Sequence, residues 1–313
     1  MSTIGTGFTM ADIARRQGGY QPVLVDALTS PRGGVVWGRL PMKQVIGWSE
    51  PFTRIEGRPT VAFRRLGEYL SPSKSSRNPY SEGIFLCSGS SKADKIKADR
   101  DPRGPGPYRV EEAWSFLEAM GYAASNQLFY GDKSTSDGFD GIYVRTGSSY
   151  ATYVDAGGVT SALSTCCSLY GFILGPGQFM GLYNVGAKGD LIEANDYGAM
   201  VDVNSSSAEN EVYRTFFNAA IGIAQYHPKS IGRLAGVSSG HKPTADLMTS
   251  LYSAMDGKPT LLATTWLGWG YLSALLSAKQ VYAPGQVDYS PYVGSYDGIP
   301  IIVDTALVDT ESA

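Results

Sequence analysis

The sequence predicts an α+β protein, and three observations support this class. Residues 108–132 have a long, regular helical pattern of apolar residues. Several short apolar runs are bounded by turn-forming residues, which is typical of strands. The composition combines 38 glycines and 20 tyrosines with only 18% charged residues, which suits a turn-rich protein with strands better than a helical bundle. A chain of 313 residues has room for about two domains.

Residues 1–50 are expected to form an extended arm with one short helix at residues 10–17, because turn-forming residues dominate the rest. Residues 51–100 predict a long β-hairpin with strands at 59–66 and 84–87. The connection between them contains SPSKSSRNPYSEG, which consists of turn formers. A loop of this length is either a loose surface loop or an arm that reaches a neighbouring subunit. The residues alone leave both interpretations open.

The segment 108–132 predicts a helix of roughly 36 Å at 1.5 Å per residue. Pro107 suits its start and Gly131 its end. Apolar residues recur at steps of three and four and define one stripe, which consists of Val110, Ala113, Trp114, Leu117, Met120, Ala124 and Leu128. The helix carries no histidine or cysteine, so it is expected to be structural.

The second half of the chain predicts alternating strands and helices. A glycine-rich link at 131–141 precedes two strands, 168–174 and 179–185, which are expected to pair as a hairpin around Gly175-Pro176-Gly177. The remaining expected elements are a strand at 213–226, a helix at 243–256, a strand at 261–265, a helix ending at Lys279 and a strand at 299–303.

Residues 259–278 are free of charged residues and about as long as a membrane span, which needs about 20 apolar residues. Three threonines and the central Gly268 and Gly270 interrupt the apolar run. A strand followed by a helix is therefore favoured over a span, and no membrane partner is expected.

The charges argue against tight nucleic-acid binding, because 26 basic residues face 29 acidic ones and the net charge is −3. The three cysteines, Cys87, Cys166 and Cys167, lack the spacing of a metal site. They are interpreted as buried apolar residues in a reducing compartment. No cofactor or metal is expected.

Catalytic motifs are incomplete. Both histidines, His227 and His241, lie in turn-forming segments. Residues 236–240 (GVSSG) match the nucleophile pattern G-x-S-x-G, but that mechanism requires an acid and then a histidine downstream. Only His241 follows Ser238, before any acid. A serine hydrolase using Ser238 and His241 is therefore the less favoured alternative to a non-enzymatic structural protein, and no catalytic residue is predicted.

The order of elements, together with several short segments, resembles the major capsid proteins of tailed double-stranded DNA bacteriophages with the HK97-like fold. The branch it resembles most is that of short-tailed phages with permuted connectivity. The segments that carry the resemblance are residues 126–132 (NQLFYGD), 138–142 (GFDGI), 154–158 (VDAGG), 186–189 (GAKG) and 296–301 (YDGIPI).

The resemblance implies a division of the chain into named domains. These are an N-terminal arm (1–50), an extended loop or E-loop (51–100), the spine helix of the P-domain (101–138), an A-domain segment (139–160), the P-domain β-sheet (161–236) and the A-domain (237–313). The A-domain would consist of helices around a small sheet.

The resemblance also implies a self-assembling virion subunit that forms the pentamers and hexamers of an icosahedral capsid around packaged DNA, with assembly in the bacterial host cytoplasm. Scaffolding, portal and decoration proteins are further candidate partners, and contact with DNA would be weak and non-specific. The same fold in encapsulin nanocompartments is an alternative. Subunit contacts are expected at Arg64, Arg65, Lys74, Arg77, Tyr80 and Glu82 of the E-loop and at Glu111, Glu112, Trp114 and Glu118 of the spine helix.

Overall fold

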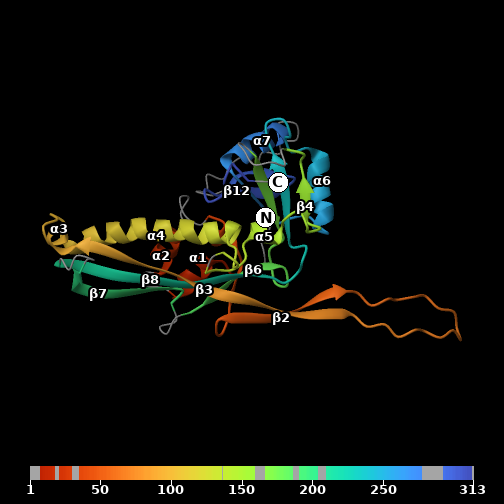
Figure 1. Ribbon diagram of the computed structural model, residues 1–313, viewed down its shortest axis with the longest axis horizontal. Helices are drawn as coiled ribbons and strands as arrows, with labels where there is room; N and C mark the ends of the chain where they lie inside the picture. The colour runs from red at the N-terminus through yellow and green to blue at the C-terminus, as the bar shows by residue number, and fades with distance from the viewer. Residues whose placement is uncertain are drawn as a thin grey trace.

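The computed structural model describes residues 8–17, 21–29, 35–135, 137–158, 166–185, 190–203, 209–276 and 292–311. These residues form two six-stranded sheets, helices that cover them and a hairpin that extends far beyond the body (Figure 1). The segment 186–189 and the expected helix end at Lys279 lie outside the described residues.

The first sheet has the order β1-β6-β8-β3-β2, with β7 also paired to β8. Strand β8 pairs with three neighbours because it is long enough for β6 to occupy one end of an edge and β7 the other. The strands are β1 (Met42–Gln44), β2 (Ser49–Gly57), β3 (Ser76–Asp94), β6 (Phe179–Asn184), β7 (Ile192–Val203) and β8 (Glu209–Gln225).

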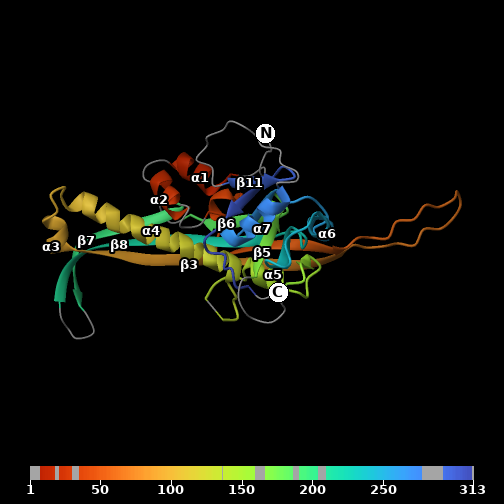
Figure 2. The same cartoon turned by 90° about the horizontal axis from the view of Figure 1, so that it is seen from above.

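A layer of helices covers one face of this sheet (Figures 1 and 2). Helix α4 runs along β3 and β8, and Phe116 stacks on Phe217 with ring centroids 5.7 Å apart. Gly89 lies under the same ring, where an added Cβ would come within 2.1 Å of the Phe116 ring, so a side chain there would force that ring to move. The helices on this side are α1 (Met10–Gln17), α2 (Gln21–Leu28), α3 (Lys95–Asp99), α4 (Pro105–Tyr130) and the 3₁₀ turn η1 (Trp37–Arg39).

The second sheet has the order β11-β12-β10-β5-β9-β4. Helices α6 (Ala245–Ala254) and α7 (Trp266–Leu276) pack on one face, where Leu251 and Leu272 join an apolar cluster with the strands. The short helix α5 (Ile142–Arg145) follows α4. The strands are β4 (Tyr153–Asp155), β5 (Cys167–Phe172), β9 (Ile231–Val237), β10 (Leu261–Thr264), β11 (Tyr292–Tyr296) and β12 (Ile299–Val303).

The two sheets meet at a buried contact that we call the junction, formed by the inner face of the second sheet, the C-terminal half of α4 and residues 304–311. The rings of Phe129 and Tyr170 pack at 5.6 Å, and both side chains are fully buried. Because the large apolar cluster includes side chains from both sheets, they share one core across this contact.

Polar groups of the junction are also paired. Arg233, only 1% exposed, donates from Nε to Ser168 Oγ at 3.0 Å and from Nη2 to Glu311 Oε2 at 3.4 Å. The hydroxyl of Tyr170 donates to the same carboxylate at 3.1 Å. Burial, with Glu311 adding to it, raises the pKa of Tyr170 well above its ordinary value, so the hydroxyl stays a donor.

A second buried carboxylate, Asp304, connects the segment after β12 to the helix layer. It accepts hydrogen bonds from the backbone N–H of Val36 at 3.2 Å, from Ser125 Oγ at 3.5 Å and from the N–H of Ala306 at 3.0 Å. Burial nevertheless raises the pKa of Asp304, because desolvation outweighs these bonds.

Many expected elements are confirmed. Helix α1 occupies the predicted residues, α4 starts three residues before the predicted 108–132, and β12 matches 299–303. Strands and helices also occur where residues 213–226, 243–256 and 261–276 predicted them. Among the described helices, none combines the length and apolar character that a membrane span needs.

The predicted hairpin of 168–174 and 179–185 is wrong. Both strands exist, but β5 lies in the second sheet and β6 in the first. Between them Gly175 and Gly177 have φ of +144° and +76°, a backbone that bends the chain from one sheet to the other. The range 161–236, expected as a single sheet, therefore divides between the two, because β9 also joins the second.

Two further expectations need correction. Residues 59–66, predicted as a strand, have no strand partner in the described chain, whereas 49–57 and 76–83 pair instead. The apolar stripe of α4 is buried only from Leu117 onward, and Val110 remains 62% exposed. The helix extends beyond the junction at that end, so the periodic stripe has less of the chain to pack against.

Candidate assembly surfaces

The hairpin formed by β2 and β3 is the first surface with features of an assembly contact. Its root, residues 49–57 and 76–83, is held by aromatic and ionic contacts. Phe52 stacks on Tyr80 at 6.0 Å and packs on Tyr226 at 4.8 Å. Arg54 lies over the Tyr80 ring at 4.4 Å and donates to the carbonyl of Gln225. These contacts fix the direction in which the hairpin leaves the sheet.

A bidentate ion pair secures the other side of the root. Arg145 donates from Nη1 and Nη2 to the two carboxylate oxygens of Glu82, at 2.5 and 2.8 Å. Paired planar groups of this kind hold geometry well. Glu82 and Tyr80, both expected at subunit contacts, are therefore engaged within their own chain.

The hairpin tip, residues 58–75, extends away from the rest of the molecule (Figures 1 and 2). Its bonds are local: Glu68 N–H donates to Arg65 O at 3.1 Å, and Arg65 N–H donates to Glu68 Oε2 at 2.9 Å. Gly67, with φ of +90°, makes this turn possible. The side chains of Arg64, Arg65, Lys74 and Arg77 are exposed, and their role as contact residues stays a prediction.

The tip also exposes large apolar side chains that the sequence assigned to a strand and not to a contact. Phe63 and Leu66 have no side-chain burial, and three more residues are exposed with them: Val61, Tyr69 and Leu70. Exposed apolar patches of this kind mark interaction sites. The signal available in the sequence was the apolar run next to an unusually long polar loop.

The first turns of α4 form a second exposed surface. Glu112 is exposed and Trp114 partly so, beside the exposed Val110. Glu111 is bound within the chain by Arg103, from Nη1 at 2.5 Å and Nη2 at 3.0 Å, and these bonds lower the pKa of Glu111. Glu118, another expected contact residue, is half-buried.

The candidate hydrolase pair has weak geometry. Ser238 Oγ and His241 Nδ1 lie 3.5 Å apart on an exposed turn. Among the described residues, His241 has no carboxylate hydrogen-bonded to its ring, which a catalytic triad would need to orient it. The structure therefore gives the alternative little support.

The cysteines are free thiols, and Cys87 is only half-buried, in contrast to the buried position expected for all three. Cys166 and Cys167 are buried, and burial raises the pKa of Cys167 to about 12, which keeps it in the unreactive thiol form. Burial likewise raises the pKa of Cys87. No cluster of three or more metal-ligating side chains occurs within the part of the chain that the structure describes.

The fold resembles solved phage capsid structures. The structure of bacteriophage Epsilon15 matches with a TM-score of 0.58 and 19% identity over 86% of this chain and 87% of that chain. The capsid of bacteriophage JBD30 matches with a TM-score of 0.50 and 11% identity over 96% and 99% of the two chains. These matches confirm the HK97-like fold.

A weaker likeness, with a TM-score of 0.46 and 9% identity over 69% of this chain and 91% of the other, is to the holo-SrpI encapsulin complex from Synechococcus elongatus. It does not bear on the choice between capsid and nanocompartment. A comparison with curated proteins finds no match.

The family model for major capsid protein GP7 matches residues 52–312, which include the hairpin tip, α4, the second sheet, the junction and the first sheet apart from β1 and the start of β2. A match over most of the chain, together with the capsid fold, establishes the family. The chain therefore belongs to the major capsid protein GP7 family and is a structural subunit of a bacteriophage capsid.

Proposed function

We propose that the hairpin is the E-loop of this capsid subunit and that its tip lies on a neighbouring subunit. The observation that carries this proposal is the fully exposed apolar set at the tip, centred on Phe63 and Leu66. Exposing these side chains to water is unfavourable, and a second copy that covers them removes this free-energy cost. Burial of apolar area is favourable at roughly 25 cal/mol per Å². The fixed root lowers the entropy lost when the tip docks.

The domain assignment follows the two sheets. In our proposal the first sheet with α4 is the P-domain, and the second sheet with α6 and α7 is the A-domain. The topology supports moving β5 and β9 from the P-domain, where the resemblance placed them, to the A-domain. Arg15 and Arg16 on α1 are candidate positions for weak contact with packaged DNA or with a neighbour.

We further propose that the subunits form pentamers and hexamers around double-stranded DNA and that assembly takes place in the host cytoplasm. The net charge of −3 supports confinement of DNA by enclosure and not by tight binding. The exposed start of α4, with Glu112 and Trp114, is a second candidate contact between subunits. Scaffolding, portal and decoration proteins stay candidate partners.

The test replaces the apolar side chains of the tip without shortening it. A chain with Val61→Ser, Phe63→Ser, Leu66→Ser and Tyr69→Ser should remain folded and soluble but form at least about tenfold fewer closed shells, because the removed area lies between subunits. Sedimentation and negative-stain electron microscopy measure the yield. The matched control, Thr60→Ala with Ser71→Ala, changes polar tip residues and should assemble normally. Normal shells from the fourfold variant would overturn the proposal.

A further inference from the structure

The face of the first sheet that lies away from α4 carries a pocket that the fold itself does not use. The register pairs Leu86 with Ala220 and Cys87 with Ala219. Cys87 Sγ lies 4.0 Å from the carbonyl of Met120 in α4, so Cys87 faces the helices. Because successive side chains of a strand point to opposite faces, Leu86 and Ala220 face away from them. We call this side of the sheet the open face.

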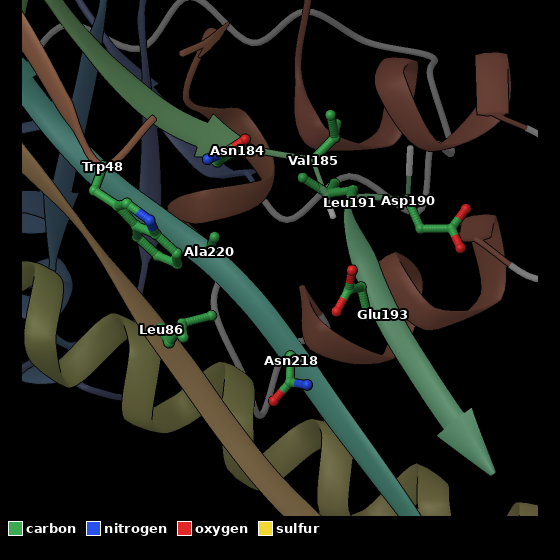
Figure 3. A pocket seen from close by; sticks show the side chains of 9 residues that line it. All are labelled: Trp48, Leu86, Asn184, Val185, Asp190, Leu191, Glu193, Asn218 and Ala220. Carbon is green, nitrogen blue, oxygen red and sulfur yellow. The ribbon is translucent and has the colours of Figure 1, made fainter. Parts of the chain in front are cut away.

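The pocket has a volume of about 310 Å³ (Figure 3). This is at the lower end of the range for ligand pockets, roughly 300–1,000 Å³, so it suits one or two side chains and not a domain. Its apolar wall includes Trp48 and Leu86, which are 58% and 57% exposed. Large apolar side chains exposed together indicate a surface that is covered in the assembled state.

The polar part of the lining has a definite charge. Asp190 and Glu193 stand at the start of β7, and Asn218 lies opposite Glu193 in the register. The pocket therefore combines an apolar wall with two carboxylates and an amide. An occupant that matches it should carry an apolar group followed by one or two cations.

The hairpin tip has an apolar residue followed by two cations. Phe63 is fully exposed and is followed directly by Arg64 and Arg65. The other aromatic residue of the tip, Tyr69, follows Glu68, whose charge would be repelled by the carboxylates of the pocket. The tip of the same chain extends beyond the body at the end opposite to β7 in both views, so the occupant must come from a second copy (Figures 1 and 2).

We propose that this pocket receives Phe63 of a neighbouring subunit's hairpin tip, with Arg64 and Arg65 beside Asp190 and Glu193. The inference rests on the proposed function and names the surface on which the tip docks. The ring of Phe63 contacts Trp48 and Leu86, which bury their exposed area in return. The carboxylates favour this register of the tip, because Phe63 is followed directly by two arginines whereas Tyr69 follows Glu68.

Cross-linking between two chains tests the contact directly. In a Cys87→Ala background, which removes the half-buried native thiol next to the pocket, one chain carries Phe63→Cys and the other Leu86→Cys. After co-assembly and mild oxidation, covalent dimers should form only in the mixture. The matched control pairs Phe63→Cys with Val110→Cys on the exposed start of α4 and should give at least about tenfold less dimer. Shells that form without dimers linked through positions 63 and 86, or dimers through position 110 instead, would overturn the proposal.

A charge exchange keeps the proposal testable if the cysteine variants assemble poorly. Arg64→Glu with Arg65→Glu should lower shell yield at least about tenfold, as should Glu193→Arg with Asp190→Arg, because each brings like charges together. The four changes in one chain should recover most of the yield. If the serine variant of the tip abolishes shells but the exchange does not rescue, the proposed function stands and this docking surface is wrong. If the serine variant assembles normally, both fail.

Discussion

The hairpin tip and the junction are both rich in aromatic and charged side chains, yet they stand in opposite relations to the rest of the chain. At the junction, Glu311 is bound by Arg233 and by Tyr170, and all three side chains are buried. At the tip, Phe63 and its neighbouring arginines extend into solvent. The two regions contain similar types of residue. They differ in whether those side chains are packed and paired within their own chain. The junction therefore stabilises the subunit itself, whereas the tip is the surface that we propose docks on a neighbouring subunit.

The largest effect should come from breaking the ionic pair of the junction. Arg233→Ala leaves Glu311 buried without its cation and is expected to lower the free energy of unfolding by roughly 3–5 kcal/mol. Urea denaturation of the unassembled subunit measures the loss. The double variant Arg233→Met with Glu311→Leu should recover much of it, because apolar groups replace both charges. A loss below about 1 kcal/mol for the single variant would contradict this role of the junction.

A smaller but clear loss is expected where the helix layer meets the link after α4. The backbones of Gly131 and Gly141 touch, with Gly141 N–H donating to Gly131 O at 2.7 Å. A Cβ on Gly141 would come within 2.9 Å of backbone atoms that cannot move aside. Gly141→Ala should therefore cost about 1–3 kcal/mol of unfolding free energy. Gly147→Ala, whose added Cβ meets its nearest atom at 3.9 Å, is the matched control and should be nearly neutral in the same melts.

The buried Asp304 gives the stability of the junction a pH dependence. Because the folded pKa of Asp304 is raised above 3.8, the folded state holds a proton that the unfolded state has already lost. The unfolding free energy should therefore fall as the pH rises from 3.8 through the folded pKa. Asp304→Asn removes this contribution. Urea titrations over this range should show the variant gaining on the parent chain with rising pH, and a constant difference would exclude the effect.

The smallest effect on stability is expected at the tip itself. Phe63→Ser should change the unfolding free energy of the unassembled subunit by no more than about 0.5 kcal/mol, since the side chain has no burial to lose. The same variant should reduce shell yield, which separates assembly from folding. Thermal melts of unassembled protein measure the first property and sedimentation the second. A loss of several kcal/mol would mean that the tip packs on its own chain.

The sequence predicted the positions of helices and strands better than it predicted which strands pair. The helices α1 and α4 and the strand β12 were placed well because local spacing and turn residues mark them. The separation of β5 from β6 could not be found, since a Gly-Pro-Gly turn between two apolar runs is also what a hairpin presents. Which strand pairs with which depends on contacts distant in the sequence.

The candidate contact residues show the same limit, namely that contacts between distant positions are not marked by local sequence. Lys74 and Arg77 are exposed as expected, but Glu82 pairs with Arg145, which lies 63 positions later. No local pattern marks such a pair. Phe63 was assigned to a strand because its neighbours favour strand geometry, although the described chain offers that segment no strand to pair with. In our proposal, the surface that this segment packs against belongs to a second copy of the chain.

The hydrogen bond from Val36 to Asp304 also limits how early the helix layer can be completed during folding. It joins positions 268 residues apart, and the helix layer gains this support only after residue 304 has emerged from the ribosome. Contacts of such separation slow folding, because a long stretch of chain must be ordered before they form. The hairpin, in contrast, joins nearby residues and can form early. A nascent subunit would thus complete its hairpin before its helix layer gains the support of the C-terminal segment.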